Sequence, residues 1–549
     1  MTATLPSKAS KPVPEIKSPK ATYRPQNNRR ILCVFPAYGR SFGTFYHSYP
    51  LTDGVKAFMP PQGILLIASY LPQEWEVRFV DENIQPAKDA DYRWADVVIT
   101  SGMHIQQPQL NKINEIAHQH NKITVIGGPS VSACPEYYPD FDILRMGELG
   151  DADDRLIELL DQSVSRPARQ HRLATTERLP LADFPSPAYE HINLNNYYLG
   201  SVQFSSGCPF RCEFCDIPEL YGRKPRLKSP EQILTELDAM TESGRAGAVY
   251  FVDDNFIGNR KAVMELLPHL IEWQKRNGYP LQFACEATLN IAQSPKILEM
   301  MREAYFTTVF CGIETPETDA LHSISKDQNL SMPILDAINI LNGYGLEVVS
   351  GIIIGFDTDT LQTGDRILDF IRRSHIPILT INLLYALPKT PLWRRLEQED
   401  RLVLNDPGRE SNVDFLLPYE DVVAMWQRCI TEAYKPEFLY ERFAYHVQNT
   451  YSNRVQVPNS TRATWPNIKR GLTLVGKILV KVGVFGNYRR TFWKMAWPLI
   501  KEGRIQSLIH TGLVGHHLIT FAQECATGQE SASFYSQKLR KAKQLVQSR

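Results

Sequence analysis

Two series of short apolar segments, separated by stretches of helical periodicity, constrain the fold of this chain more than any other feature. The first series begins at residues 31–35, with an apolar run of the kind that parallel sheets bury on both faces. Short strands that alternate with helices predict a doubly wound α/β domain, whose ligands bind beyond the carboxyl ends of the strands. Further strands of this series are expected at residues 76–80, 96–100 and 124–126, and helices at residues 63–71 and 110–119.

The second series predicts a partial barrel. Six parallel strands joined by crossover helices make an open barrel, because they are too few to close a complete one. The strands are expected at residues 202–204, 248–252, 281–286, 308–313, 347–354 and 379–384, with helices at residues 230–241, 261–276 and 294–304.

The chain has 549 residues, enough for about three domains at roughly 100–200 residues each. The first 30 residues are polar and rich in proline, which predicts disorder. A polar stretch that contains Pro180, Pro185 and Pro187 is typical of a linker between domains. The predicted parts are a disordered basic tail (1–30), a Rossmann-like domain (31–162), a linker (163–196), a partial barrel (197–400) and a mainly helical C-terminal region (401–549).

The formal net charge of zero conceals an uneven distribution of charge. Residues 1–30 contain seven basic residues and one acid, and residues 461–549 contain fifteen basic residues and three acids. The part between them therefore carries a net charge of −18. We find no pattern of a secretion signal and no apolar stretch of about 20 residues that could span a bilayer. We expect a cytoplasmic protein, peripheral on the inner face of a membrane.

Three cysteines close together carry the strongest chemical signal. Cys208, Cys212 and Cys215 have the spacing C-x3-C-x2-C and directly follow a predicted strand. Three thiolates on one loop can bind three irons of a [4Fe–4S] cluster and leave the fourth iron open to a small molecule. The alternative is a zinc site, but zinc prefers four protein ligands and no second pair lies nearby. Cys285 and Cys311 fall in predicted strands, where a buried free thiol is the common interpretation.

The triplet, with an aromatic residue before its last cysteine, resembles the radical S-adenosylmethionine (radical SAM) enzymes. The resemblance implies that the open iron binds SAM and that an electron from the cluster cleaves it to a 5′-deoxyadenosyl radical. Catalysis then depends on the cofactors, and no residue of the protein is assigned as an acid or a base. For acids such as Asp254, capping of a helix is the alternative role. The implied SAM contacts are Phe214, Asp253, Asp254, Glu286, Glu314, Gly351 and Gly355.

An α/β domain that precedes such a barrel resembles the cobalamin-binding subgroup of this family. Glycine loops let the backbone approach a bulky corrin, and the alternative is a degenerate Rossmann-like domain that binds a nucleotide or nothing. The sequence lacks the Asp-x-His-x-x-Gly motif whose histidine ligates cobalt in other cobalamin enzymes, and the surroundings of His104 do not match it. We therefore expect no histidine as the lower ligand. The implied cobalamin contacts are Ser101, Gly102, Gly127, Gly128, Pro129, Ser130, Gly147 and Glu148.

Four further segments are similar to the bacterial hopanoid carbon-2 methyltransferases. They are residues 41–45, 47–54, 212–218 and 414–419. The resemblance implies methylation of the A ring of a hopanoid lipid. One SAM methylates reduced cobalamin, a second SAM provides the radical that removes hydrogen from the ring, and the carbon radical takes the methyl group. A reducing partner such as a ferredoxin or a flavodoxin is also implied. The alternatives are a cobalamin-dependent reaction on a tetrapyrrole side chain or another lipid, and a non-catalytic iron–sulfur and cobalamin sensor.

The C-terminal region provides separate support for a lipid substrate. Leu472, Val475, Leu479 and Val482 recur at helical spacing among basic residues and tryptophans. Such an amphipathic stretch can lie on an anionic membrane surface. The alternative is an ordinary helical domain with a solvated basic face. No motif supports binding of nucleic acid.

Overall fold

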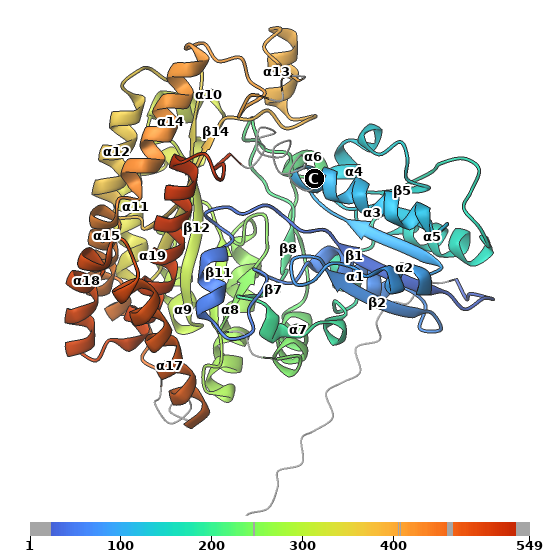
Figure 1. The fold of residues 1–549 in the computed structure, drawn as a ribbon, viewed down its shortest axis with the longest axis horizontal. Coiled ribbons are helices and arrows are strands. Elements are labelled where there is room, and N and C mark those ends of the chain that lie inside the picture. The colour runs from blue at the N-terminus through green and yellow to red at the C-terminus, as the bar shows by residue number, and fades with distance from the viewer. Residues whose placement is uncertain (1–22, 245–246, 405, 407, 458–464, 534–549) are drawn as a thin grey trace, which may run out of the picture.

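The structure, a computed structural model, describes residues 23–244, 247–404, 406, 408–457 and 465–533. The first α/β domain lies beside a second α/β domain, and the C-terminal helices cover the side of the second domain that faces away from the first (Figure 1). Both sheets are parallel and six-stranded, so the predicted fold class is confirmed.

The first sheet has the strand order β2-β1-β3-β4-β5-β6. Ile31 to Val34 of the first strand are all buried, because helices cover both faces of the sheet and apolar cores form on each. The strands are β1 (Arg30–Phe35), β2 (Glu76–Asp81), β3 (Val97–Ser101), β4 (Ile123–Gly127), β5 (Ile143–Met146) and β6 (His171–Ala174). The helices are α1 (Gln62–Tyr70), α2 (Asp89–Trp94), α3 (Gln107–Gln119), α4 (Pro129–Ala133) and α5 (Asp151–Gln162).

The first domain extends beyond its predicted limits at both ends. β6 pairs with β5 but lies within the predicted linker, because this short edge strand alternates half-buried and exposed residues and shows no apolar run. At the other end, Tyr23 and Asn27 donate hydrogen bonds to Asp161, so the expectation of disorder is wrong for the last residues of the tail. The rest of that expectation concerns residues 1–22, which lie outside the described residues.

The second sheet has the order β14-β13-β12-β11-β10-β7 and forms the partial barrel. The predicted strand at residues 202–204 is divided, because the chain leaves the sheet after Val202 and enters a small hairpin with the next segment. The strands are β7 (Gly200–Val202), β10 (Ala248–Phe251), β11 (Gln282–Glu286), β12 (Phe306–Glu314), β13 (Glu347–Ile354) and β14 (Ile378–Leu383), and the hairpin is β8 (Ser205–Ser206) with β9 (Arg226–Leu227). The helices are α6 (Ile217–Leu220), α7 (Pro230–Glu242), α8 (Arg260–Asn277), α9 (Pro295–Glu303), α10 (Thr318–Ser323), α11 (Ile334–Gly343) and α12 (Thr363–Ser374).

A segment of the N-terminal part, residues 42–58, reaches both edges of this barrel. The ring of Phe42 stacks on Tyr434, whose hydroxyl accepts a hydrogen bond from the backbone of Leu379 in the edge strand β14. Ala57 and Phe58 accept backbone hydrogen bonds from the residues just before the other edge strand, β7. Between these contacts lies the short helix η1 (Tyr46–Leu51). We call residues 42–58 the crossing segment, because it spans the open side of the barrel.

The C-terminal helices share one apolar core with the barrel. The longest of them, α19, is largely buried, and no helix among the described residues is long and apolar enough to cross a membrane. Val482, which we expected on an exposed apolar face, is buried. Val475 and Leu479 pack against the same core, so this stripe faces the protein and only Leu472 of the four predicted residues is exposed. The elements are α13 (Pro391–Gln398), α14 (Tyr419–Ala433), α15 (Pro436–Asn449), α17 (Trp465–Ile478), η10 (Leu479–Val484), α18 (Arg489–Lys501) and α19 (Ile505–Ala526).

Candidate functional site

The three cysteines lie on one loop between β8 and α6, at the carboxyl end of the barrel strands. Cys212 is buried, and its sulfur accepts a hydrogen bond from Gln328 at 3.3 Å. Burial raises the pKa of the Cys208 and Cys215 thiols, and in Cys215 the charges of the other two cysteines raise it further. A positively charged group such as iron would therefore be needed to keep these thiols ionised.

The donor set fits a cluster better than a zinc ion, because zinc takes four protein ligands and this loop supplies three thiolates. In the part of the chain that the structure describes, no three Cys, His, Asp or Glu side chains gather around one point, as the ligands of a zinc ion do. A four-iron cluster binds each cysteine at a different iron. Three thiolates on one loop can therefore hold three of the four irons, and Cys208, Cys212 and Cys215 are three such residues.

Asp253 and Asp254, at the end of β10, fasten the chain that leads into this loop. Asp253 accepts a hydrogen bond from the backbone N–H of Phe204 at 3.1 Å, and Asp254 accepts one from Gly207 at 2.7 Å. Burial raises the pKa of Asp253 to about 7 and that of Asp254 to about 6. Neither residue caps the next helix, whose N-cap is Asn259. Their predicted contact with SAM stays a prediction.

Glu286 ends β11 and faces the interior of the barrel. Its carboxylate accepts a hydrogen bond from Tyr250 at 3.3 Å, and burial raises its pKa to about 7. Tyr250 lies on β10, one strand away. The two side chains thus form a half-buried polar pair at the predicted SAM site.

Glu314, at the end of β12, forms a buried ion pair with Lys326. Burial lowers the pKa of Lys326, but the carboxylate and two of the cysteines outweigh it, so the pKa is raised. The lysine ammonium also lies 5.3 Å from the centre of the Phe214 ring. A Cβ added to Gly351 would lie 3.5 Å from a carboxylate oxygen of Glu314. Phe214 and Gly351, two of the predicted SAM contacts, therefore lie beside this ion pair.

A cavity of about 190 Å³ adjoins the cysteine loop. Phe214 lines it together with Phe356 and Leu384, which follow β13 and β14. Gly355 lies directly before Phe356 and has a φ of +111°. A Cβ added to it would clash with the ring of Phe415. Only glycine combines this conformation with that close packing.

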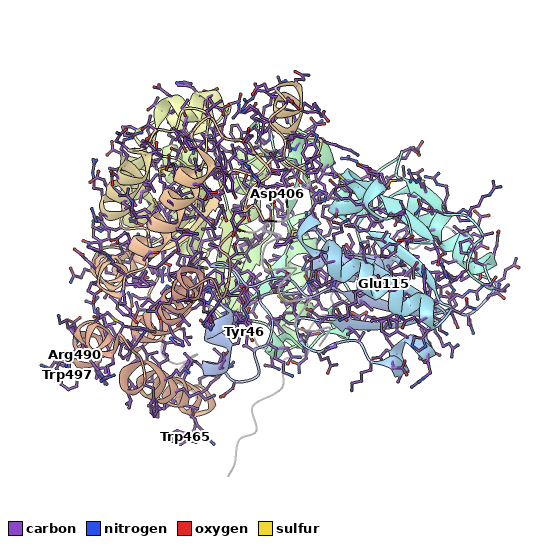
Figure 2. The ribbon with its side chains drawn as sticks, turned by 45° about the horizontal axis from the view of Figure 1, so that its top comes forward. Tyr46, Glu115, Asp406, Trp465, Arg490 and Trp497 are labelled. Atoms are coloured by element: carbon purple, nitrogen blue, oxygen red, sulfur yellow. The ribbon has the colours of Figure 1, made fainter. Side chains whose placement is uncertain are left out.

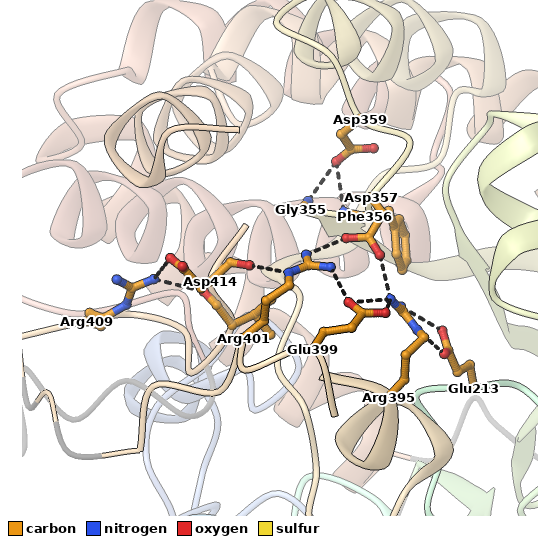
Figure 3. A network of polar contacts seen from close by, with 11 residues as sticks. Glu213, Gly355, Phe356, Asp357, Asp359, Arg395, Glu399, Arg401, Arg409 and Asp414 are labelled. Atoms are coloured by element: carbon orange, nitrogen blue, oxygen red, sulfur yellow. Dashed lines mark hydrogen bonds and ion pairs between the residues drawn. The ribbon is translucent and has the colours of Figure 1, made fainter. Parts of the chain in front are cut away.

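A network of ion pairs forms the outer wall of the cavity (Figure 3). Arg395 of α13 binds Glu213 of the cysteine loop at 2.6 Å and Asp357 at 2.7 Å, and Asp357 also binds Arg401. Burial raises the pKa of Asp357, but hydrogen bonds from the two arginines outweigh it and lower the pKa. The network joins the loop to the chain that follows β13 and to the C-terminal region.

The strand ends of the first domain form a second cluster, lined by glycine. Gly128 follows β4 with φ +94°, and an added Cβ would clash with the hydroxyl of Ser101 and lie 3.2 Å from the nitrogen of Gly102. Ser130 hydrogen-bonds the Nδ1 of His104 at 2.9 Å and the hydroxyl of Tyr138 at 2.5 Å. Gly128 thus lets the ends of β3 and β4 approach each other closely.

The remaining predicted residues of this domain lie at the same edge. Gly127 ends β4 and Pro129 starts α4, while Gly147 follows β5 with φ +95°. All eight predicted cobalamin residues therefore belong to the carboxyl ends of β3, β4 and β5 and their loops. Their contact with cobalamin itself stays a prediction.

Glu148 connects the two clusters. Its carboxylate accepts a hydrogen bond from Ser206, two residues before the first cysteine, at 2.9 Å. It also forms ion pairs with Arg226 of β9 and, at 3.0 Å, with Arg178. The edge of the first sheet is thereby fixed against the start of the cysteine loop.

Several of these residues carry no signal in the sequence. Lys326, Tyr250, Arg226 and Arg395 pair with partners that lie 12 to 182 positions away along the chain. No spacing rule covers such distances, so only the folded structure identifies them.

Three family models match parts of the chain. Residues 50–157 match the B12 binding domain, residues 202–371 match the Radical SAM superfamily, and residues 390–531 match a domain of unknown function, DUF4070.

Individual proteins resemble the whole chain. It is 58% identical over 517 residues to the hopanoid C-2 methylase of Rhodopseudomonas palustris, covering 94% of this chain and 98% of that protein. It is 34% identical to an uncharacterized methyltransferase of Synechocystis sp., covering 89% of this chain and 90% of that protein. The solved structure of the cobalamin-dependent SAM radical enzyme OxsB, with aqua-cobalamin and SAM bound, covers 93% of this chain and 83% of that one, with a TM-score of 0.57 and 14% identity. At that identity the likeness concerns the fold.

Proposed function

Because the chain belongs to the family of the hopanoid C-2 methylase, we propose that it methylates carbon 2 in the A ring of a hopanoid. The observation that carries this proposal is the contact of Glu148 with Ser206. This contact places the glycine-lined edge of the B12 binding domain against the cysteine loop of the radical SAM domain. A methyl donor and a site for removal of hydrogen can then serve the same carbon atom.

The enzyme uses a [4Fe–4S] cluster, SAM and cobalamin. The cluster and SAM supply the one-electron chemistry that removes hydrogen from an unactivated ring carbon, and cobalamin supplies the methyl group. The residues of the protein hold these groups, orient them and exclude water.

Cys208, Cys212 and Cys215 would hold the cluster, and Asp253 and Asp254 keep their loop in place through its backbone N–H groups. Phe214, which lines the cavity beside this loop, would contact SAM. Glu314 is joined through Lys326 to the surroundings of Phe214 and the cysteine loop. It would orient the amino group of SAM.

The inner face of β13 offers an apolar strip to a hydrocarbon substrate, beside the polar pair of Tyr250 and Glu286. Alternate residues of a strand share a face, and a Cβ added to Gly351 would lie within 3.7 Å of Phe310 and 3.4 Å of Thr380. Val349 and Ile353 lie on the same face of β13 and are half-buried, whereas their neighbours Val348, Ile352 and Ile354 are fully buried. An apolar lining of this kind excludes water from a reaction at an aliphatic carbon.

The proposal is tested by incubating the reconstituted holoenzyme with a hopanoid, SAM and a reductant in the absence of oxygen. The expected product is heavier than the substrate by one CH₂ group and carries it at carbon 2, as mass spectrometry and NMR would report. No methylated hopanoid, despite cleavage of SAM, would refute the proposal. Loss of the gene should in parallel remove 2-methylated hopanoids from the lipid profile of the cell.

Glu148→Gln provides a test of the link between the two cofactor sites. The variant keeps the shape of the side chain and loses the charge that binds Arg226 and Arg178. The ratio of methylated product to cleaved SAM should fall by about 10- to 100-fold, because a misplacement of about 1 Å costs that much in rate. The ratio is measured by quantifying both products, and Glu148→Asp should recover part of it.

Asp89→Asn is the matched control for Glu148→Gln, because Asp89 forms an exposed ion pair elsewhere in the first domain. It should leave the product ratio unchanged. An unchanged ratio in Glu148→Gln would show that this carboxylate does not align the two sites.

We also propose where the enzyme meets its partners. A hopanoid is a membrane lipid, so the enzyme would work at the inner face of a membrane as a peripheral protein, and a ferredoxin or flavodoxin would supply its electrons. The basic C-terminal region supports the first of these proposals, because its charge complements anionic lipids. Fractionation of cells that produce the full chain would test it.

A further inference from the structure

The exposed apolar side chains of the described residues are unevenly distributed. Of fourteen large apolar side chains that are exposed, eight lie between Trp465 and Ile505. Trp465 is 74% exposed, Leu472 66% and Phe485 76%. Single exposed apolar residues are common on proteins, but a group on adjoining elements marks a surface that binds something.

Seven of these eight side chains lie on or next to three adjoining elements, α17, η10 and α18. Trp465, Ile468 and Leu472 have the spacing i, i+3, i+7 and so share one face of α17. η10 packs against both α17 and α18. Val484, its last residue, and Phe485, which follows it, are both exposed. Figure 2 shows Trp465, Arg490 and Trp497 at one end of the molecule, far from Glu115 of the first domain. We call this set the docking surface: Trp465, Ile468, Leu472, Val480, Val484, Phe485 and Trp497.

Basic residues surround the docking surface. Residues 465–505 contain nine basic residues and one acid. Arg490, Lys494 and Lys501 recur at helical spacing on the face of α18 that carries Trp497, and all three are exposed. Arg490 and Lys494 form no ion pair within the described part of the chain. A protein partner of ordinary composition would leave this dense positive charge uncompensated, whereas an anionic bilayer neutralises it and buries the aromatic and aliphatic groups.

The docking surface adjoins the open side of the barrel. Lys477 of α17 forms an ion pair with Asp53 of the crossing segment at 2.5 Å. Ser48 of the same segment donates a hydrogen bond to the backbone of Leu513 in α19 at 2.9 Å. A bilayer that contacts α17 would therefore lie next to the segment that spans the barrel opening.

We infer that the docking surface binds the enzyme to an anionic lipid bilayer, with α17 and α18 lying along the membrane plane and the crossing segment turned toward it. This inference rests on the proposed function, since it gives the lipid substrate a short path to the barrel. No helix needs to cross the bilayer, because interfacial binding uses only one face of each helix.

The test is co-sedimentation of the full-length holoenzyme with vesicles. The vesicles contain phosphatidylcholine alone or mixed with phosphatidylglycerol. The wild-type chain should sediment with the mixed vesicles and much less with phosphatidylcholine alone. The triple variant Trp465→Ser, Leu472→Ser and Phe485→Ser should bind the mixed vesicles at least about tenfold more weakly, because three exposed apolar groups no longer enter the bilayer.

The control variant carries Val164→Ser and Leu361→Ser, which alter equally exposed apolar side chains outside the docking surface. It should bind the vesicles as the wild type does. Equal binding by the triple variant, or an equal loss in the control variant, would overturn the inference. So would dimerisation of the wild type without lipid that the triple variant abolishes, because the surface would then bind a second copy of the chain.

Failure of this inference can be distinguished from failure of the proposed function. The triple variant should retain methylation of a hopanoid dispersed in detergent, because none of its three positions lines the barrel. A wild-type enzyme that binds vesicles but methylates no hopanoid would refute the function and leave the docking surface in place.

Discussion

Cys212→Ala should lower methylation by at least about 1,000-fold, because a cluster held by only two thiolates no longer presents one open iron at a fixed position. Cys212 is the most buried of the three cysteines and lies between the other two in the loop. The substitution removes one sulfur and leaves the buried strands intact. Iron and sulfide content, the absorbance of the reconstituted protein and product formation measure the effect.

Cys525→Ala is the matched control for Cys212→Ala. Cys525 is a half-buried free thiol in α19, remote in sequence from the loop. This variant should keep full iron content and turnover. That result would show that the protein does not lose its activity whenever any thiol is removed. If Cys212→Ala retained its iron and its turnover, the cysteine loop would not be the cluster site.

Strands with continuous apolar runs were predictable to within a few residues. β13 was predicted at its observed limits, because the strand is buried on both faces and its sequence is almost wholly apolar. β6 was not predicted, because an edge strand of four residues with alternating exposure resembles a loop. Hydrophobic periodicity did not predict the crossing segment either, because contacts with residues far along the chain, such as that of Phe42 with Tyr434, hold it in place.

The position of the candidate site was predictable, but the pairing of its side chains was not. Residues at the carboxyl ends of parallel strands meet at one edge, so Asp254 and Glu314 could be assigned to the site from sequence. Sequence patterns do not show which way each carboxylate turns. Asp254 binds backbone of the cysteine loop, and Glu148, expected at cobalamin, forms ion pairs at the interface of the two domains. These outcomes depend on the packing of one domain against the other.

Lys326→Met should lower the free energy of unfolding by about 3–5 kcal/mol, because removal of one partner leaves the other charge of a buried pair uncompensated. Here the uncompensated charge is the carboxylate of Glu314, which is buried next to the cysteine loop. Denaturant unfolding of the protein measures the loss. Binding of SAM should weaken as well, since Lys326 is the cation that orients the Glu314 carboxylate.

Lys228→Met separates these two effects. Lys228, directly after β9, and Glu236 of α7 form another buried ion pair, with both side chains 2% exposed. Its loss should cost a similar free energy of unfolding but leave the affinity for SAM unchanged in the folded protein. The double variant Glu314→Gln and Lys326→Met should regain much of the stability, because no buried charge is then unpaired. It should still bind SAM weakly, and a double variant with wild-type affinity for SAM would show that the pair serves stability alone.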